Sequence, residues 1–216
     1  MKKLLKQFGN RFHRYLQIAG LSKRYFRNEK AIQEVFAHFS NLSNSAALDI
    51  GSGPIPKNPF KAKYVFGADL RENKEANVVH ADLAFGRLPF ENDSFDYVTA
   101  FDVLEHIQRI AVSDGETRFP FIQLMNEIFR VLKPGGVFFN LQPCYPSKEA
   151  FQDPTHVNIM TEDTLSLYFC ESAWARIYGF EGSFEMLEEG WVGGKFFSFM
   201  KKTSDRPIRD LAFVQK

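Results

Sequence analysis

Residues 46–54, with the sequence Ala-Ala-Leu-Asp-Ile-Gly-Ser-Gly-Pro, constrain the fold more than any other stretch of the chain. They have the pattern of a short apolar strand carrying an acid, followed by a turn with the spacing Gly51-x-Gly53. Glycine allows backbone dihedral angles that a Cβ atom would forbid, and it allows close approach to a ligand. In an open parallel sheet, ligands bind beyond the carboxyl ends of the strands, where such a turn lies. The stretch therefore predicts the first strand of an α/β sheet and a site for a nucleotide-like cofactor.

The residues after the turn argue against two common nucleotide sites. A dinucleotide-binding turn has the pattern G-x-G-x-x-G, whose third glycine lets the helix pack on the strand. Proline occupies that position here, as Pro56. A phosphate-binding loop would need G-x-x-x-x-G-K-[ST], which the chain lacks. A nucleotide-dependent oxidoreductase is therefore disfavoured, while a plain strand-to-helix turn without a ligand stays open.

Four further segments predict the rest of a parallel sheet. Residues 64–70 end in an acid and a leucine, with Asp69 twenty positions after Asp49, a distance at which an acid binds ribose hydroxyls in nucleotide-binding folds. Residues 78–83 are a second short apolar run near an acid. Residues 88–101 give a loop and a strand, and residues 128–140 give a helix end, a Pro-Gly-Gly turn and another strand. This alternation predicts an α/β fold, a doubly wound sheet with helices on both faces.

The ordered set of motifs resembles the class I S-adenosylmethionine-dependent methyltransferases of type 11. The matching stretches are LDIGSGP, GADL, ADL…LPFENDSFDYVTAFDVLEHI and RVLKPGG, which together span about residues 45 to 141. The resemblance implies S-adenosylmethionine as the cofactor and a Rossmann-like, mostly parallel sheet that closes with an antiparallel strand pair. Residues 183–187 and 195–200, around a turn at 190–194, suit that pair.

The same resemblance implies cofactor contacts at the ends of the first four strands, at Asp49, Gly51, Gly53, Asp69, Leu70, Asp82, Leu83, Phe101 and Asp102. The first three would line the methionine part of the cofactor, and Asp69 would hold the ribose hydroxyls. Asp82 would accept a hydrogen bond from the adenine amino group, with Leu83 against the ring. The last two would close the pocket. Without a ligand, Asp69 would be a solvated strand-end acid and Asp82 a turn residue.

The chain departs from the family pattern directly after the glycine turn. Pro54, Pro56 and Pro59 follow, and proline breaks a helix anywhere beyond its first turn. We therefore expect a short or absent first helix and a methionine pocket of altered shape. This departure supports an alternative in which the chain is a non-catalytic binding or regulatory protein, whereas the acids at 69 and 82 argue against it.

Two histidines are the candidates for catalysis. The sulfonium is already an activated methyl donor, so the protein mainly aligns the acceptor, and a hydroxyl acceptor also needs a base near neutral pH. His106 follows the fourth strand, and His156 lies in an irregular segment after the fifth. We expect His156 to act as a base or to orient the substrate, with a purely structural loop histidine as the alternative.

The spacing Asp102-x-x-Glu105 has two interpretations. It is close to a capping box, in which both side chains satisfy the first turn of a helix. Alternatively, Asp102, Glu105 and His106 lie within one helical turn, and His156 could complete a site for a divalent metal ion. We favour the capping role and expect no metal.

The first thirty residues carry nine lysines and arginines against Glu29 alone, although the whole chain has a net charge of +1. Their apolar residues recur at helical spacing, at Leu4, Phe8, Phe12, Tyr15 and Ala19. We expect a basic amphipathic cap over residues 1–40, a methyltransferase domain over 41–202 and a tail over 203–216. The cap could pack as a lid, bind an anionic membrane surface through residues 1–30, or bind a phosphorylated or nucleic-acid substrate. Nucleic acid is disfavoured because no RNA-binding module is recognisable.

The remaining features favour a cytoplasmic enzyme, peripheral at the membrane at most. Cys144 and Cys170 match no metal or redox spacing, and we see neither a signal peptide nor a spanning segment. The segment 153–158, Asp-Pro-Thr-His-Val-Asn, is similar to that of bacterial methyltransferases acting on small molecules or surface-glycan precursors. The sequence thus favours O-methylation of a small-molecule or glycan acceptor.

Overall fold

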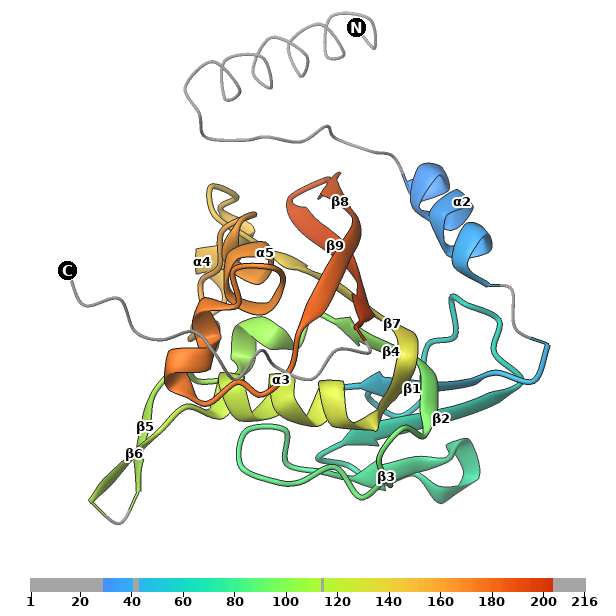
Figure 1. Ribbon diagram of the computed structural model, residues 1–216, viewed down its shortest axis with the longest axis horizontal. Coiled ribbons are helices and arrows are strands. Elements are labelled where there is room, and N and C mark those ends of the chain that lie inside the picture. Colours follow the sequence, from blue (N-terminus) through green and yellow to red (C-terminus); the bar gives the residue numbers. More distant parts are fainter. Residues whose placement is uncertain (1–28, 41–42, 114, 204–216) are drawn as a thin grey trace, which may run out of the picture.

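The computed structural model describes residues 29–40, 43–113 and 115–203, and its centre is a seven-stranded sheet in the order β3-β2-β1-β4-β7-β9-β8 (Figure 1). The strands are β1 (Ala46–Ile50), β2 (Tyr64–Asp69), β3 (Val78–His80), β4 (Phe95–Phe101), β7 (Leu132–Pro143), β8 (Phe184–Val192) and β9 (Lys195–Lys202). The first five pair in parallel, and β9 runs antiparallel between β7 and β8. The predicted Rossmann-like fold, with an antiparallel final strand pair, is confirmed.

Two details of the strand predictions change. The hairpin between β8 and β9 turns at Gly193 and Gly194, so Gly190, Trp191 and Val192 belong to β8 and not to the turn. The Pro-Gly-Gly segment lies inside β7, where the pairing with β4 shifts register after Leu132.

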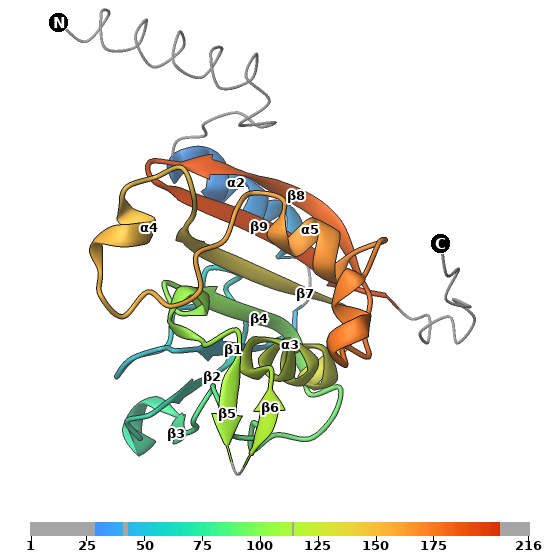
Figure 2. The same cartoon turned by 90° about the vertical axis from the view of Figure 1, so that its left-hand side faces the viewer.

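Alternating side chains of the central strands face two separate apolar clusters, one on each side of the sheet. Phe138 lies in one cluster and its neighbour Phe139 in the other. Helix α2 (Glu29–Phe39) covers the second face with Ile32 and Phe36. Helix α3 (Pro120–Val131) covers the first face, with Leu124, Met125 and Ile128 in its cluster. Figure 2 shows α2 behind β8 and β9, with α3 and α5 (Thr164–Phe169) in front.

No helix connects β1 to β2, as the three prolines predict. Residues 51–63 run through turns, and Phe60 fills the space beside the sheet by stacking on Tyr97 with ring centroids 4.2 Å apart. The Asn58 side chain holds this loop through two hydrogen bonds with the backbone of Ala62, at 2.8 and 2.9 Å. A proline-rich loop with one aromatic anchor therefore replaces the first helix.

The crossovers after β4 and β7 carry small elements that the sequence patterns did not predict. Strands β5 (Ala111–Ser113) and β6 (Glu116–Arg118) form a hairpin apart from the main sheet. The remaining elements are helix α4 (Glu149–Gln152) and the 3₁₀-helices η1 (Lys74–Ala76), η2 (Leu104–His106) and η3 (Trp174–Tyr178).

The predictions for the first 28 residues, including the apolar stripe, and for residues 204–216 lie outside the described residues, so the domain boundaries stay predictions. Both cysteines are buried free thiols. Within the described part of the chain, no helix is long and apolar enough to cross a bilayer.

Candidate active site

The parallel register brings the predicted cofactor residues to one edge of the sheet. Ile50, at the end of β1, pairs with Ala68 of β2 on one side and Ala100 of β4 on the other. Asp69, at the end of β2, pairs with His80 of β3. The turns that follow these strands therefore lie side by side at the carboxyl edge, where ligands bind in this class of fold.

The glycine turn needs both of its glycines, for different reasons. Gly51 and Gly53 have φ angles of +63° and +65°, a region that favours glycine. A Cβ atom on Gly51 would lie 2.4 Å from Cγ2 of Val103, whereas a Cβ on Gly53 would meet nothing within 4 Å. Gly51 thus lets the loop after β4 pack against the turn, and Gly53 faces open space in which a ligand could lie.

Asp49 holds the loop and does not face the open edge. Its carboxylate is buried, accepting a hydrogen bond from the Thr99 hydroxyl at 2.7 Å and another from the Lys57 amide at 2.8 Å. Burial raises the pKa of Asp49 above its ordinary value, and these two hydrogen bonds oppose the rise. Any effect of Asp49 on a cofactor would therefore pass through the loop backbone.

Asp69 links the end of β2 to the glycine turn. Its carboxylate accepts hydrogen bonds from the amide of Gly53 at 2.9 Å and from the amide and side chain of Arg71 at 3.0 and 3.3 Å. Partial burial acts to raise the pKa of Asp69, but these hydrogen bonds outweigh it and leave the pKa below its usual value. Asp69 is thus held as an anion beside the turn, with the exposed Arg71 side chain as a contact that a ribose could replace.

The predicted adenine contacts lie after β3 in a tight turn. The exposed Asp82 accepts a hydrogen bond from the Ala84 amide at 2.9 Å, which is the turn role considered from the sequence. Leu83 is half-buried against the core beneath the sheet edge. Leu70 is 65 % exposed and open to a ligand.

Two lysines that the sequence analysis did not single out contact the residues at the end of β4. The Lys57 ammonium lies 4.8 Å from the centre of the Phe101 ring, and Lys195 forms an ion pair with Asp102 at 2.5 Å. Asp102 has a φ of +56°, its carboxylate pairs with Lys195 of β9, and the 3₁₀-helix η2 has no side-chain cap. Lys57 lies between the prolines of the loop after β1, whereas only the fold brings Lys195 to this edge.

The capping-box interpretation of Asp102 and Glu105 is wrong. Helix η2 begins after Val103 without a side-chain cap, and Glu105 points inward, 1 % exposed. Among the residues that the structure describes, neither Glu105 carboxylate oxygen has a hydrogen-bond partner. Burial raises the pKa of Glu105 from 4.5 to about 7, so this carboxyl exchanges protons near neutral pH.

The two predicted catalytic histidines meet at Glu105. Nε2 of His156 lies 3.9 Å from a Glu105 oxygen, and the rings of His156 and His106 are 4.8 Å apart between centroids. Backbone hydrogen bonds fix this meeting, because the amides of Val157 and Asn158 both donate to the Glu105 carbonyl at 2.9 Å. The structure thus brings together Glu105, His106 and His156 and leaves Asp102 out.

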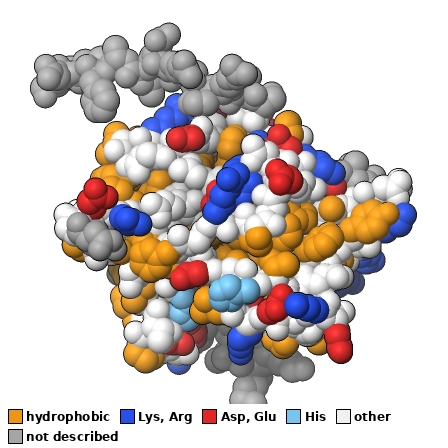
Figure 3. Space-filling view, turned by 90° about the horizontal axis from the view of Figure 1, so that it is seen from below, with side chains coloured by type: hydrophobic (Ala, Val, Ile, Leu, Met, Phe, Trp, Pro, Cys, Tyr) orange, Lys and Arg blue, Asp and Glu red, His pale blue; other side chains and the backbone are white. Residues whose placement is uncertain are grey.

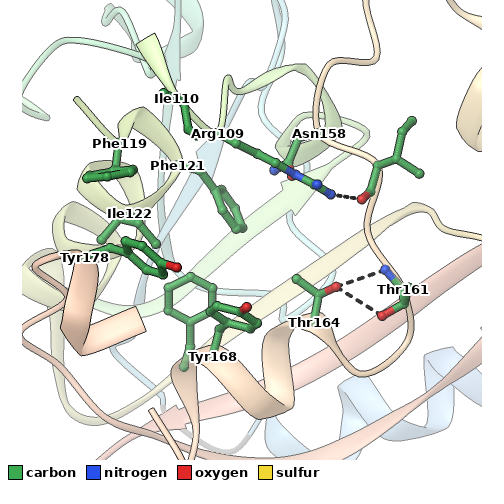
Figure 4. A pocket seen from close by; sticks show the side chains of 12 residues that line it. Arg109, Ile110, Phe119, Phe121, Ile122, Asn158, Thr161, Thr164, Tyr168 and Tyr178 are labelled. Carbon is green, nitrogen blue, oxygen red and sulfur yellow. Dashed lines mark hydrogen bonds between the residues drawn. The ribbon is translucent and has the colours of Figure 1, made fainter. Parts of the chain in front are cut away.

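An aromatic cavity of about 460 Å³ lies beside this histidine cluster. Asn158 lines it and joins the two, since its side chain donates to the Leu104 carbonyl at 3.0 Å and accepts from Arg109 at 2.7 Å. Figure 4 shows aromatic side chains on the left and centre of the cavity and threonines on the right, namely Phe119, Phe121, Tyr168 and Tyr178 against Thr161 and Thr164. Its size and lining suit a small organic molecule.

Residues 48–140 match the sequence profile of the family described as a methyltransferase domain. The fold and the acids at the strand ends are consistent with this match to a methyltransferase domain. Residues 48–140, slightly less than half of the chain, thus resemble the methyltransferase domain of the class I S-adenosylmethionine-dependent family.

Similar proteins carry the same domain in larger chains. Sterol 24-C-methyltransferase of Schizosaccharomyces pombe is 26 % identical over 139 residues, which are 53 % of this chain and 34 % of the relative. Demethylmenaquinone methyltransferase of Listeria welshimeri is 35 % identical over 86 residues, covering 34 % of this chain and 31 % of the relative. The matched part thus spans about a third of these curated relatives. A methyltransferase from Aquifex aeolicus, described as dependent on S-adenosylmethionine, shares the fold with a TM-score of 0.52 at 16 % identity, over 78 % of this chain and 88 % of that one.

Proposed function

We propose that this protein transfers the methyl group of S-adenosylmethionine to a hydroxyl oxygen of a small molecule or glycan precursor. The observation that carries the proposal is the position of a buried carboxyl and two histidines at the same sheet edge as the glycine turn. In the reaction, an acceptor oxygen forms a bond to the methyl carbon, the carbon–sulfur bond breaks, and the hydroxyl proton leaves. An alcohol gives up this proton reluctantly, so the cluster of Glu105, His106 and His156 has a task that a more acidic acceptor would not need.

We assign the cofactor to the edge formed by Gly51, Gly53, Asp69, Asp82 and Phe101. The open space above Gly53 and the anionic state of Asp69 support this assignment, because a ribose needs a hydrogen-bond acceptor next to a turn without side chains. The acceptor would occupy the aromatic cavity that Asn158 joins to the cluster.

The first test is calorimetric titration with S-adenosylhomocysteine, using NAD as the control ligand. We expect micromolar binding that Asp69→Ala removes and Glu185→Ala keeps, since Glu185 forms a surface ion pair with Lys201 at the far strand β8. Absence of binding by the wild type would contradict the proposal and favour the non-catalytic alternative.

The second test identifies the acceptor atom. A panel of hydroxylated acceptors with methyl-labelled cofactor would be assayed with His156→Ala and, as a matched control, with His38→Ala on α2. We expect the label on oxygen, with turnover lost only in His156→Ala. The name of the sterol methyltransferase specifies a carbon acceptor, and a label on carbon would refute O-methylation while retaining the methyltransferase activity.

A further inference from the structure

Three potential metal ligands meet at the carboxyl edge of the sheet. Glu105 and His106 come from helix η2 directly after β4, and His156 comes from the loop after α4. One ligand atom from each residue lies within 4.8 Å of the others. Figure 3 shows histidine side chains next to acidic ones on the face seen from below. Val103, which directly precedes η2, packs against Gly51, so the cluster lies near the glycine turn.

Glu105 lacks the partner that a buried carboxylate requires. The side chain is 1 % exposed, and neither oxygen has a hydrogen-bond donor among the described residues. Burying a carboxylate without a partner is costly, and buried charges are normally paired or bound to a metal ion. The 3.9 Å to Nε2 of His156 is too long for a hydrogen bond but leaves room for a shared cation.

The hydrogen bonds of the two histidines leave their Nε2 atoms available as ligands. Nδ1 of His156 lies 3.3 Å from the carbonyl oxygen of Ala150, which can only accept, so Nδ1 carries the proton. Nδ1 of His106 lies 3.0 Å from the hydroxyl oxygen of Thr155, whose own proton goes to Asp153 at 2.6 Å. His106 therefore donates from Nδ1 as well. Histidines bound to metal ions are commonly oriented by such a donation from the other nitrogen.

The carboxylates around His156 strengthen the case for a cation. Its Nε2 lone pair faces a Glu105 oxygen and an Asp153 oxygen, each at 3.9 Å. Two carboxylate oxygens this close to an unprotonated nitrogen repel it unless a positive charge lies between them.

We propose that Glu105, His106 and His156 bind one divalent zinc ion, with an open fourth position. Two imidazoles and one carboxylate are a ligand set of catalytic zinc sites, whose ligand bonds are about 2.0–2.2 Å long. Ligand atoms on such a tetrahedral ion lie about 3.3 Å apart, so the pair at 3.9 Å closes by roughly half an ångström, and separations of up to 4.8 Å close by up to about 1.5 Å, through side-chain rotation. His106 is exposed, which leaves an entry path for the ion and a position for an oxygen ligand.

The site would give the proposed methyl transfer its means of activating the acceptor, and this consequence rests on the proposed function. A hydroxyl oxygen in the fourth position would lose its proton to solvent more readily, because bound zinc lowers the pKa of its oxygen ligands. The deprotonated oxygen would then attack the methyl carbon as the carbon–sulfur bond breaks. His106 and His156 would act as ligands and not as the base.

The experiment is a cobalt(II) titration of chelator-treated, full-length protein, followed by competition with zinc. Cobalt replaces zinc and reports tetrahedral coordination through intense visible absorption. We expect one equivalent to bind and zinc to displace it. Glu105→Gln and His106→Ala should each weaken binding by more than about 100-fold, since loss of outer-shell partners alone costs about 10- to 100-fold. His38→Ala on α2 is the matched control and should bind as the wild type does.

The outcomes separate the metal site from the methyltransferase proposal. Failure of the wild type to bind cobalt or zinc, or equal binding by His106→Ala, would overturn the metal site. Because His106 is exposed, loss of fold is not expected in that variant, and circular dichroism checks it. The same samples are titrated with S-adenosylhomocysteine. Metal binding without cofactor binding would refute the proposed function alone, and cofactor binding without metal binding would refute the zinc site alone.

Discussion

Alanine substitutions at Gly51 and Gly53 separate steric crowding from backbone strain within one turn. The two residues have nearly the same φ, +63° and +65°, so alanine has the same backbone cost at both, about 1–2 kcal/mol. Restriction of the unfolded chain offsets about 0.4–1 kcal/mol of this cost at both sites. Only the surroundings differ between the two variants.

The surroundings predict a larger loss of stability at Gly51. Its new Cβ would lie 2.4 Å from Cγ2 and 2.8 Å from Cβ of Val103, and relieving such overlap in a packed region costs about 1–3 kcal/mol. A Cβ on Gly53 has no neighbour within 4 Å. We therefore expect Gly51→Ala to lower the free energy of unfolding by about 1–3 kcal/mol more than Gly53→Ala does.

Urea denaturation followed by tryptophan fluorescence measures both variants. Gly51→Ala in a Val103→Ala background should recover part of the loss, because the Cβ atom at 2.8 Å remains. Gly53→Ala should instead weaken S-adenosylhomocysteine binding, since its methyl group would project into the open space assigned to the cofactor. Equal destabilisation by the two alanines would refute the reasoning, as would unchanged cofactor affinity in Gly53→Ala.

Three further predictions address the burial of Glu105, the packing of Phe36 and a polar clamp, by which we mean the hydrogen bonds that Arg130 makes to Glu127 and to two loop carbonyls. Burial raises the pKa of Glu105 from 4.5 to about 7, so ionising this carboxyl lowers the free energy of unfolding of the metal-free protein by about 3 kcal/mol. This loss of stability is absent below pH 4.5, grows between pH 4.5 and 7, and is complete above pH 7. Glu105→Gln should therefore gain stability over the wild type as pH rises through that window, and parallel pH profiles in urea titrations would contradict this. Phe36→Ala removes a ring 4.6 Å from that of Phe139 and should cost about 3–5 kcal/mol by thermal unfolding, whereas a loss below about 1 kcal/mol would mean that α2 is not packed on the sheet. Arg130→Lys loses the 2.6 Å contact to Glu127 and its bonds to two loop carbonyls, so urea titration should show a loss of about 1–3 kcal/mol, and a neutral result would refute the clamp.

The sequence predicted the sheet because its signals are local and ordered along the chain. Five apolar runs, each ending at a turn or an acid, correspond to β1, β2, β3, β4 and β7. Three prolines predicted the missing first helix, since proline restricts its own backbone whatever surrounds it. The hairpin β5–β6 was not predicted, because its two strands are three residues long and carry little periodic pattern.

In the candidate site, too, some features followed from local sequence and others did not. Placement of Asp69 beside Gly53 follows from chain order, because parallel strands that pair in register end at one edge. The spacing of Asp102 and Glu105 misled, because a capping box and a buried acid have the same local sequence. The positive φ of Asp102 and its ion pair with Lys195 decided between them.

By itself, the sequence determined the α/β fold and predicted the sheet edge at which a cofactor would bind, since backbone stereochemistry and hydrophobic periodicity act over a few residues. Only the tertiary structure decided that Glu105 is buried without a hydrogen-bond partner among the described residues, and that His156 approaches it to 3.9 Å. These facts depend on how the loop after β7 packs on the loop after β4, through the amides of Val157 and Asn158. Contacts between segments so far apart in the chain leave no local pattern, because packing and long-range hydrogen bonds set them.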